Sequence, residues 1–167
     1  PSIVILKDMV KPLFKGKKIM AASGNANIDW HLLKGKTVTD FKTWGKHLLI
    51  CTKGATIRVH LLMLGTYAIN ERKKYKPRLH LQFSNGELNF YTCSVKLIEG
   101  NLNDEYDWEA DVMNKHWNAK KAKQKLKEYP TVLICDALLD QDIFSGVGNI
   151  IKNEILFMAK VHPKSKV

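Results

Sequence analysis

Residues 78–92 constrain the fold more than any other part of this sequence, because two alternating segments flank a short turn there. Residues 78–83 and 87–92 place an apolar side chain at every second position, which is typical of half-buried strands. Ser84, Asn85 and Gly86 lie between them, and an Asn-Gly pair favours a hairpin because both residues tolerate positive φ. The segment therefore predicts an antiparallel hairpin with one apolar face, which needs a second layer to cover it.

The residues around this hairpin predict further strands. Residues 37–51 and 55–70 are rich in β-branched and aromatic side chains. Together with the hairpin they predict antiparallel β structure over residues 36–99, folded as a sandwich or a barrel.

Residues 2–20 predict an amphipathic helix ahead of the strands. The apolar residues that recur at helical spacing are Ile3, Leu6, Met9 or Val10, and Leu13. Pro1 suits a first helical turn, where its missing N–H costs nothing. Pro12 is expected to end or kink the helix just before it.

The chain changes character after residue 100. Five acidic residues lie within residues 101–112, and this segment predicts a connector between a domain at 1–100 and a domain at 113–167. Residues 113–127 predict a helix with six lysines and no acidic residue. Such a run is most often a solvated helix face.

Residues 136–163 predict two helices joined by a turn that contains glycine. The apolar residues of the first helix are Leu138, Leu139, Ile143 and Phe144. Gly146 and Gly148 allow the turn to approach another molecule closely. Asn149 is expected to cap the second helix, and Lys152 lies one turn further on. This pattern indicates either a phosphate site at the helix N-terminus or a tight turn that binds nothing.

The net charge of the chain indicates which classes of partner it can bind. Lys and Arg number 27 against 16 Asp and Glu, so the net charge is +11. Only Arg58, Arg72 and Arg78 are arginines, so the other 24 of these 27 cations are lysines. Lysine binds phosphate as a point charge and reads bases poorly, so the excess favours a nucleic-acid backbone or an anionic membrane surface. A basic soluble enzyme with a solvated lysine face fits the composition equally well.

The cysteines predict neither disulfides nor a metal site. Cys51, Cys93 and Cys135 are scattered and form no C-x-x-C pair, so we expect buried, reduced thiols.

No apolar segment has the roughly 18–20 residues that a membrane-spanning helix needs. We therefore expect no membrane partner.

Several motifs closely resemble those of the formamidopyrimidine-DNA glycosylase / endonuclease VIII family. They are residues 44–49 (WGKHLL), 59–65 (VHLLMLG), 138–141 (LLDQ), 146–150 (GVGNI), 154–157 (EILF) and 162–163 (HP). The resemblance covers essentially the whole chain. It implies an α+β fold in which an N-terminal helix and an antiparallel β-sandwich are followed by a helical domain with a helix–two-turn–helix motif.

The resemblance also implies base excision repair. Family members flip an oxidised base out of duplex DNA and attack C1′ of its sugar with an N-terminal proline amine. The Schiff base that results releases the base, and elimination then cuts the strand. The implied activity is that of a bifunctional DNA glycosylase/AP lyase. The implied partner is double-stranded DNA that contains oxidised bases or abasic sites.

Site residues follow from the same motifs. Lys46 matches the family's hairpin lysine, which reaches the active site, so we predict a catalytic role rather than that of an ordinary strand lysine. Met63 matches the residue that fills the gap left by the flipped base, although the pattern by itself favours a core methionine. Asn149 matches an asparagine that binds phosphates near the lesion. Gly146 and Gly148 permit that approach, and Lys152 is predicted to reach the same phosphate.

Three departures from the family pattern stand out. The family begins Pro-Glu-x-Pro, whereas this sequence begins Pro1-Ser2, so Pro1 matches the second proline. We therefore expect the nucleophilic proline and its glutamate to precede residue 1. Lys96 and Leu97 stand where many members have Arg-x-Phe. No ligands of the family's C-terminal zinc finger lie within this chain, so we expect no cofactor and no metal site in it.

Two other functions fit parts of the sequence. A natural family member that lacks the proline and glutamate would recognise damaged DNA without cutting it. Structural RNA-binding proteins use a similar helical motif, although the β region with Lys46 and Met63 disfavours that interpretation. For the family interpretation we expect a monomer in the cytoplasm of a bacterium, associated with the nucleoid.

Overall fold

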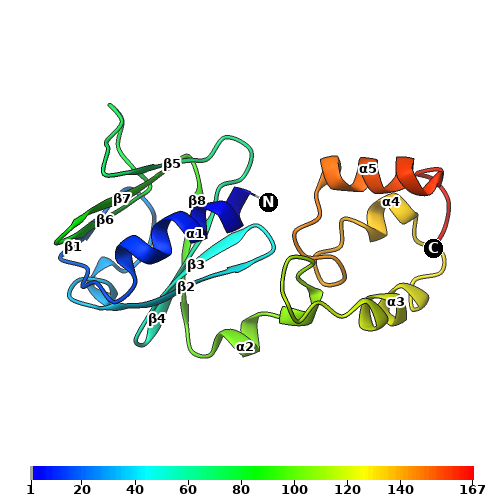
Figure 1. Cartoon of the computed structure of the whole chain (residues 1–167), viewed down its shortest axis with the longest axis horizontal. Coiled ribbons are helices and arrows are strands. Elements are labelled where there is room, and N and C mark those ends of the chain that lie inside the picture. The colour runs from blue at the N-terminus through cyan, green and yellow to red at the C-terminus, as the bar shows by residue number, and fades with distance from the viewer. Residues whose placement is uncertain (1) are drawn as a thin grey trace. The chain divides into compact units, whose positions relative to one another are not determined.

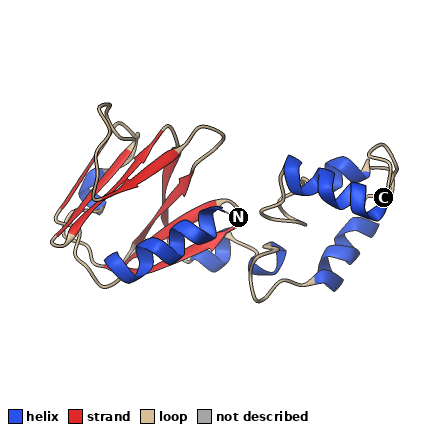
Figure 2. Cartoon of the chain, turned by 45° about the horizontal axis from the view of Figure 1, so that its top comes forward, coloured by secondary structure: helices blue, strands red, loops and turns tan. Residues whose placement is uncertain are grey.

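The computed structural model describes residues 2–167, so the prediction for Pro1 lies outside the described residues. The chain forms two compact units, one that ends at Leu102 and one from Asn103 to Val167 (Figure 1). The first unit contains a helix and antiparallel strands, and the second contains helices (Figure 2). The α+β fold class predicted from the sequence is confirmed.

The first unit begins with helix α1 (Ser2–Phe14), which is shorter than the predicted 2–20. Its buried residues are Ile3, Leu6, Val10 and Phe14. The predicted Leu13 is 39% exposed, because the buried stripe continues from Val10 to Phe14.

Pro12 does not end α1, so the first of its two predicted effects, an end of the helix just before it, is wrong. A proline removes the hydrogen bond to the carbonyl four residues earlier, which here belongs to Asp8. Asp8 and Pro12 are both exposed, so water can solvate that carbonyl. Only two residues of helix follow Pro12, and the second of them, Phe14, is fully buried. Its burial offsets the lost bond.

Within residues 2–167, eight strands form two antiparallel sheets. The first sheet has the order β1-β6-β7-β5, and the second has the order β2-β3-β4-β8. The strands are β1 (Ala21–Ser23), β2 (Val38–Trp44), β3 (His47–Thr52), β4 (Ala55–His60), β5 (Thr66–Ile69), β6 (Leu79–Phe83), β7 (Gly86–Tyr91) and β8 (Ser94–Glu99). A single turn of 3-10 helix, η1 (Trp30–Leu32), lies between β1 and β2.

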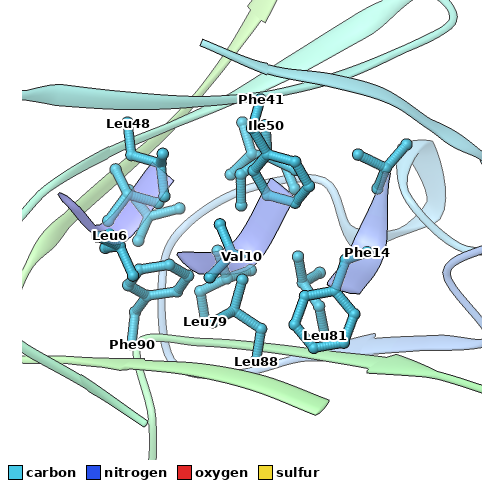
Figure 3. Close-up of a cluster of buried hydrophobic side chains, with 14 of the residues drawn as sticks. Leu6, Val10, Phe14, Phe41, Leu48, Ile50, Leu79, Leu81, Leu88 and Phe90 are labelled. Atoms are coloured by element: carbon cyan, nitrogen blue, oxygen red, sulfur yellow. The ribbon is translucent and has the colours of Figure 1, made fainter. Parts of the chain in front are cut away.

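The core lies between the two sheets and α1. Figure 3 shows Leu6, Val10 and Phe14 of α1 between side chains of the two sheets. The rings of Phe14 and Phe83 stack with centroids 4.5 Å apart. The helix therefore supplies part of the core that joins the sheets, and burial of such side chains is the main stabilising contribution.

The predicted hairpin is β6–β7, but its turn is shifted by one residue. Phe83 pairs with Gly86, so the two turn residues are Ser84 and Asn85. Gly86 opens β7 with φ 150°, and a Cβ there would lie 2.0 Å from the Asn70 side-chain oxygen. Glycine is therefore required by close packing at the start of the strand.

The predicted strand region 55–70 is two strands in different sheets. β4 belongs to the second sheet and β5 to the first, and the loop 61–65 passes between them. Leu62 in this loop has φ 57°, which a regular strand cannot accommodate.

The acidic segment folds as part of the second unit. It contains α2 (Leu102–Glu105) and η2 (Trp108–Ala110), and α3 (Ala119–Lys127) follows. Lys121 forms ion pairs with Asp107 at 3.0 Å and with Glu109 at 2.9 Å. These contacts explain why part of the lysine-rich run faces protein. The run is helical only from residue 119, because the Asn118 side chain caps the helix.

The last two helices are α4 (Ile134–Ala137) and α5 (Asn149–Ala159). The first predicted helix of the motif is therefore a single turn that lies upstream of Leu139, Ile143 and Phe144. Those residues lie in the turns and the bend that follow α4, where the Asp140 side chain accepts a hydrogen bond from the backbone N–H of Asp142 and closes a turn.

The prediction of buried cysteines is confirmed in part. Cys51 and Cys93 are buried as predicted, whereas Cys135 is only half-buried. Within residues 2–167, no helix has the length and apolar character needed to cross a membrane.

Candidate nucleic-acid interface

Lys46 lies at the tip of the β2–β3 hairpin. Trp44 pairs with His47, so Gly45 and Lys46 form the two-residue turn between them. Gly45 has φ 54°, the left-handed conformation that such tight turns demand. The Lys46 side chain is exposed, as a phosphate-binding lysine must be.

The register of the second sheet brings Lys46 close to the loop 61–65. His47 on β3 pairs with His60 on β4, and their rings meet edge to face with centroids 5.1 Å apart. His60 is the last residue of β4, and the loop follows it directly. Lys46 and Met63, which are 17 positions apart in the sequence, therefore belong to the same end of this sheet.

Met63 projects from the loop 61–65 into solvent. Its side chain is 96% exposed, and the neighbouring Leu62 and Leu64 are 60% and 77% exposed. The Gly65 N–H donates to the Leu61 carbonyl at 2.7 Å and closes the loop. Met63 is therefore not a core residue. Its exposed side chain lies where it can insert into another molecule. Exposed apolar side chains gathered in this way mark interaction sites.

Gly65→Ala is expected to distort this loop. A Cβ at residue 65 would lie 2.0 Å from the Leu61 carbonyl oxygen, so the backbone that closes the loop must move. We expect faster hydrogen exchange at residues 61–66. Gly54→Ala is the comparison, because Gly54 has φ 93° and open space around its Cβ position, so its strain stays in the β3–β4 turn and exchange at residues 61–66 should not change. Equal exchange in the Gly65 variant and the unaltered chain would contradict the expectation.

His47 and His60 were not singled out by the sequence analysis. Burial lowers the pKa of His47 to about 4, with additional effects from the positive charge of Arg58 and from His60. Burial also lowers the pKa of His60, and the charges of Lys46 and Arg58 add to that shift. Both rings are therefore neutral at pH 7, and Lys46 and Arg58 carry the positive charge here. The two histidines are 13 positions apart in the sequence, and the register of β3 and β4 brings them together.

The histidine pair makes the first unit sensitive to acid. Below pH 6.5 the unfolded chain takes up a proton at His47, whereas the folded chain resists this down to about pH 4. Protons then favour the unfolded state, so the free energy of unfolding falls as the pH decreases through this window. His47→Phe removes the titration, and we expect it to flatten the pH dependence of urea unfolding between pH 6.5 and about 4. An unchanged slope would contradict this.

The second unit holds the glycine turn. Gly146 is buried, and its φ is 98°, a conformation that favours glycine. The Gln141 amide donates to the carbonyls of Leu139 and Val147 at 2.8 and 3.1 Å, and its oxygen accepts from the Gly146 N–H at 3.0 Å. Gln141 therefore holds the turn in shape. Sequence reasoning assigned it no role, because one glutamine in a motif gives no sign of three simultaneous contacts.

Asn149 does not cap α5, contrary to the prediction. The cap position belongs to Gly148, and Asn149 is the first helical residue. Its side-chain oxygen instead accepts a hydrogen bond from the Lys152 ammonium group at 3.0 Å. The amide N–H groups of Asn149 and the Lys152 ammonium group therefore lie together at the helix N-terminus, where unpaired backbone N–H groups also favour an anion.

The predicted site residues thus form two groups, one in each unit. Lys46 and Met63 belong to the first unit, and Gly146, Gly148, Asn149 and Lys152 belong to the second. Each group places positive charge or N–H donors beside a backbone turn. Within residues 2–167, no three metal-ligating side chains gather at one place.

Both units match known protein families in sequence. The profile of the formamidopyrimidine-DNA glycosylase N-terminal domain matches residues 1–94, and that of the formamidopyrimidine-DNA glycosylase H2TH domain matches residues 109–167. The chain is 33% identical over 149 residues to endonuclease 8-like 3 of Mus musculus, which covers 83% of this chain and 25% of the relative. It is 30% identical over 145 residues to endonuclease 8 2 of Mycobacterium tuberculosis, which covers 81% of this chain and 57% of the relative.

The chain therefore spans about a quarter of the vertebrate relative and somewhat more than half of the mycobacterial one. Its fold is similar to that of Lactococcus lactis formamidopyrimidine-DNA glycosylase, solved non-covalently bound to DNA that contains an AP site. The TM-score is 0.83 at 22% identity, and the match covers 98% of this chain and 69% of that one. A second structure, in which the Lactococcus lactis protein is inhibited and bound to N7-benzyl-Fapy-dG DNA, gives 0.84.

Proposed function

Because this chain belongs to the formamidopyrimidine-DNA glycosylase / endonuclease VIII family, we propose that it is the DNA-binding core of a base excision repair enzyme. The proposed activity of the intact protein is that of a DNA glycosylase with AP lyase activity on oxidised bases. The proposed partner is duplex DNA that contains an oxidised base or an abasic site. The protein binds it as a monomer.

Met63 is the observation that carries this proposal. An apolar side chain that is 96% exposed at a loop tip costs solubility unless a partner covers it. Insertion between base steps covers it, and the insertion fills the space that a flipped nucleotide leaves. Lys46 at the same end of the sheet supplies a positive charge for the adjacent phosphates.

The second unit supplies a separate phosphate contact. The N-terminus of α5 presents its backbone N–H groups, the Asn149 amide and the Lys152 ammonium group to an anion. Such contacts position a duplex without reading its sequence. This suits a protein that must search all sequences for damage.

The chemical step of the proposal is Schiff-base formation at C1′ of the damaged nucleotide. A secondary amine attacks C1′ and loses its proton, and the base departs with the glycosidic electron pair and takes up a proton. The bond from C1′ to the ring oxygen O4′ then breaks, O4′ leaves as a hydroxyl group, and the nitrogen lone pair forms the iminium. The iminium makes the C–H at C2′ acidic. Elimination then breaks the C–O bond to phosphate. The proposed nucleophile is the secondary amine of the family's N-terminal proline, and Lys46 stabilises the charge on the departing phosphate.

Binding measurements on two duplexes test this function. One duplex carries an abasic analogue, and the other has the same sequence without damage. We expect preference for the abasic duplex, and affinity that falls steeply with salt because lysine–phosphate contacts release counterions. Met63→Ala should reduce the preference, and Asn149→Ala should weaken binding to the abasic duplex.

Met20→Ala is the matched control, because Met20 is a 55% exposed methionine of the same unit that lies outside the loop. It should leave the preference unchanged. Equal affinity of the unaltered chain for both duplexes, or a flat salt dependence, would overturn the proposed function.

A further inference from the structure

Met63 presents the most exposed sulfur atom among the five methionines of the chain. Its side chain is 96% exposed, that of Met158 is 79% exposed, and the other three lie between 46% and 55%. The remaining residues of the loop 61–65 are three leucines and a glycine, whose side chains peroxides do not oxidise under mild conditions. Met63 is therefore the one side chain of this loop whose polarity an oxidant can change.

The sulfur of Met63 also lacks a polar contact that another methionine of the first unit has. The Tyr67 hydroxyl donates a hydrogen bond to the sulfur of Met9 at 3.9 Å, which engages one of its lone pairs. Within residues 2–167, no hydrogen bond reaches the sulfur of Met63. We therefore expect Met63 to be oxidised faster than Met9.

The cysteines of the first unit compete poorly for the same oxidant. Cys51 and Cys93 are both buried. Burial raises the pKa of the Cys51 thiol and raises that of Cys93 to about 11. Because a thiol reacts as its thiolate, both cysteines react slowly at pH 7. The sulfur atom most open to a peroxide in the first unit is thus that of Met63.

Oxidation of Met63 by hydrogen peroxide is a two-electron step. A lone pair of the sulfur attacks one peroxide oxygen, and the S–O bond forms as the O–O bond breaks. The second oxygen leaves as hydroxide and takes the proton of the new S–OH group, which gives water and the sulfoxide. The sulfur is oxidised and the peroxide is reduced. An apolar side chain becomes a polar one that accepts hydrogen bonds.

The sulfoxide should affect a DNA complex and leave the fold unchanged. In the folded chain Met63 packs into no core, so the sulfoxide oxygen stays in water. In the proposed complex the same side chain lies between base steps, where the oxygen loses its water and gains no donor. Burial of an unpaired polar group is costly, so oxidation weakens the insertion alone.

We propose that Met63 is a reversible oxidation site whose sulfoxide lowers the preference for abasic DNA. Methionine sulfoxide reductases restore the thioether, with two electrons from thiols and release of the oxygen as water. Damage recognition then depends on the balance between peroxides and thiols around the protein. This inference rests on the proposed function, because the insertion of Met63 is the step that oxidation weakens.

The test treats the unaltered chain with graded hydrogen peroxide and measures sulfoxide at each methionine by peptide mass spectrometry. Affinities for the abasic and the undamaged duplex are measured on the same samples. We expect their ratio to fall as Met63 sulfoxide accumulates, by about tenfold at complete oxidation, because one unpaired polar group is buried. Two reductases, one for each sulfoxide epimer, should restore the ratio. Hydrogen exchange of the β7 amides should not change, because the fold is unaffected.

Two variants assign the effect to one methionine. Met158→Leu removes the next most exposed sulfur, and peroxide should lower its ratio of affinities as it does for the unaltered chain. Met63→Leu has no sulfur in the loop 61–65, so its ratio should be the same before and after peroxide. Excess abasic duplex should slow the oxidation of Met63 in the unaltered chain and leave that of Met20 unchanged.

The outcomes separate this inference from the proposed function. Only the inference falls if the untreated chain prefers the abasic duplex and keeps that preference with Met63 fully oxidised. It also falls alone if peroxide lowers the ratio equally in Met63→Leu, or if Met63 stays unoxidised at doses that convert Met9. If the untreated chain does not prefer the abasic duplex, the proposed function falls and the inference falls with it.

Discussion

Lys46→Ala is expected to lower strand cleavage at an abasic site by about 10²-fold, measured in a form of the chain that carries Pro-Glu-Gly ahead of Pro1. Lys46 lies at an exposed hairpin tip whose backbone is fixed by the β2–β3 register. A pre-organised positive charge stabilises the phosphate as the C–O bond breaks, and loss of one such group typically costs 10²–10³-fold. The measurement is single-turnover cleavage of an abasic duplex.

Two further variants make this result specific. Lys46→Arg keeps the charge and should retain more activity than Lys46→Ala. Lys53→Ala removes a lysine from the β3–β4 turn, at the opposite end of β3 from Lys46, and should leave cleavage unchanged. Cleavage by Lys46→Ala at the rate of the Lys53→Ala control would show that Lys46 has no part in the reaction.

Phe14→Ala is expected to destabilise the first unit by about 3–5 kcal/mol, the usual cost of removing a buried phenylalanine. Phe14 is fully buried, stacks on Phe83 and ends the helix that packs between the sheets. Its removal leaves a cavity where α1 meets the first sheet. Hydrogen exchange of the β7 amides reports this unit separately from the helical one.

Leu13→Ala is the matched control for Phe14→Ala. Leu13 is the adjacent residue of the same helix turn and is 39% exposed, so we expect a loss of about 1 kcal/mol or less. Equal losses from the two variants would contradict the packing described for α1.

The fold could be predicted largely from hydrophobic periodicity, and the predictions that failed are those that depend on tertiary contacts. The spacing of Ile3, Leu6 and Val10 correctly predicts α1, but the end of the helix depends on Phe14 finding a place beside Phe83. That contact joins residues 69 positions apart, so no local pattern reveals it. The same holds for β4 and β5, whose separation into two sheets follows from the tertiary fold.

The candidate site was harder to predict from the sequence than the fold. Exposure decides whether Met63 is a core or an inserting residue, and a run of apolar residues such as 61–64 gives no information on exposure. The His47–His60 pair depends on strand register, and the Gln141 contacts depend on the shape of the turn. The motif resemblance supplied Lys46, Met63 and Asn149, and their roles remain predictions.

Borohydride trapping on a duplex with an abasic site tests the proposed chemistry most directly. The chain as it stands and a form with Pro-Glu-Gly ahead of Pro1 are incubated with the duplex and reductant, and each N-terminus is checked by intact mass. The proposed function predicts a covalent protein–DNA adduct from the extended form, because reduction fixes the iminium at C1′. An adduct from the chain as it stands would instead make Pro1 the nucleophile. Adducts from neither form, together with tight binding to the abasic duplex, would contradict the lyase proposal and leave a protein that recognises damage without cutting it.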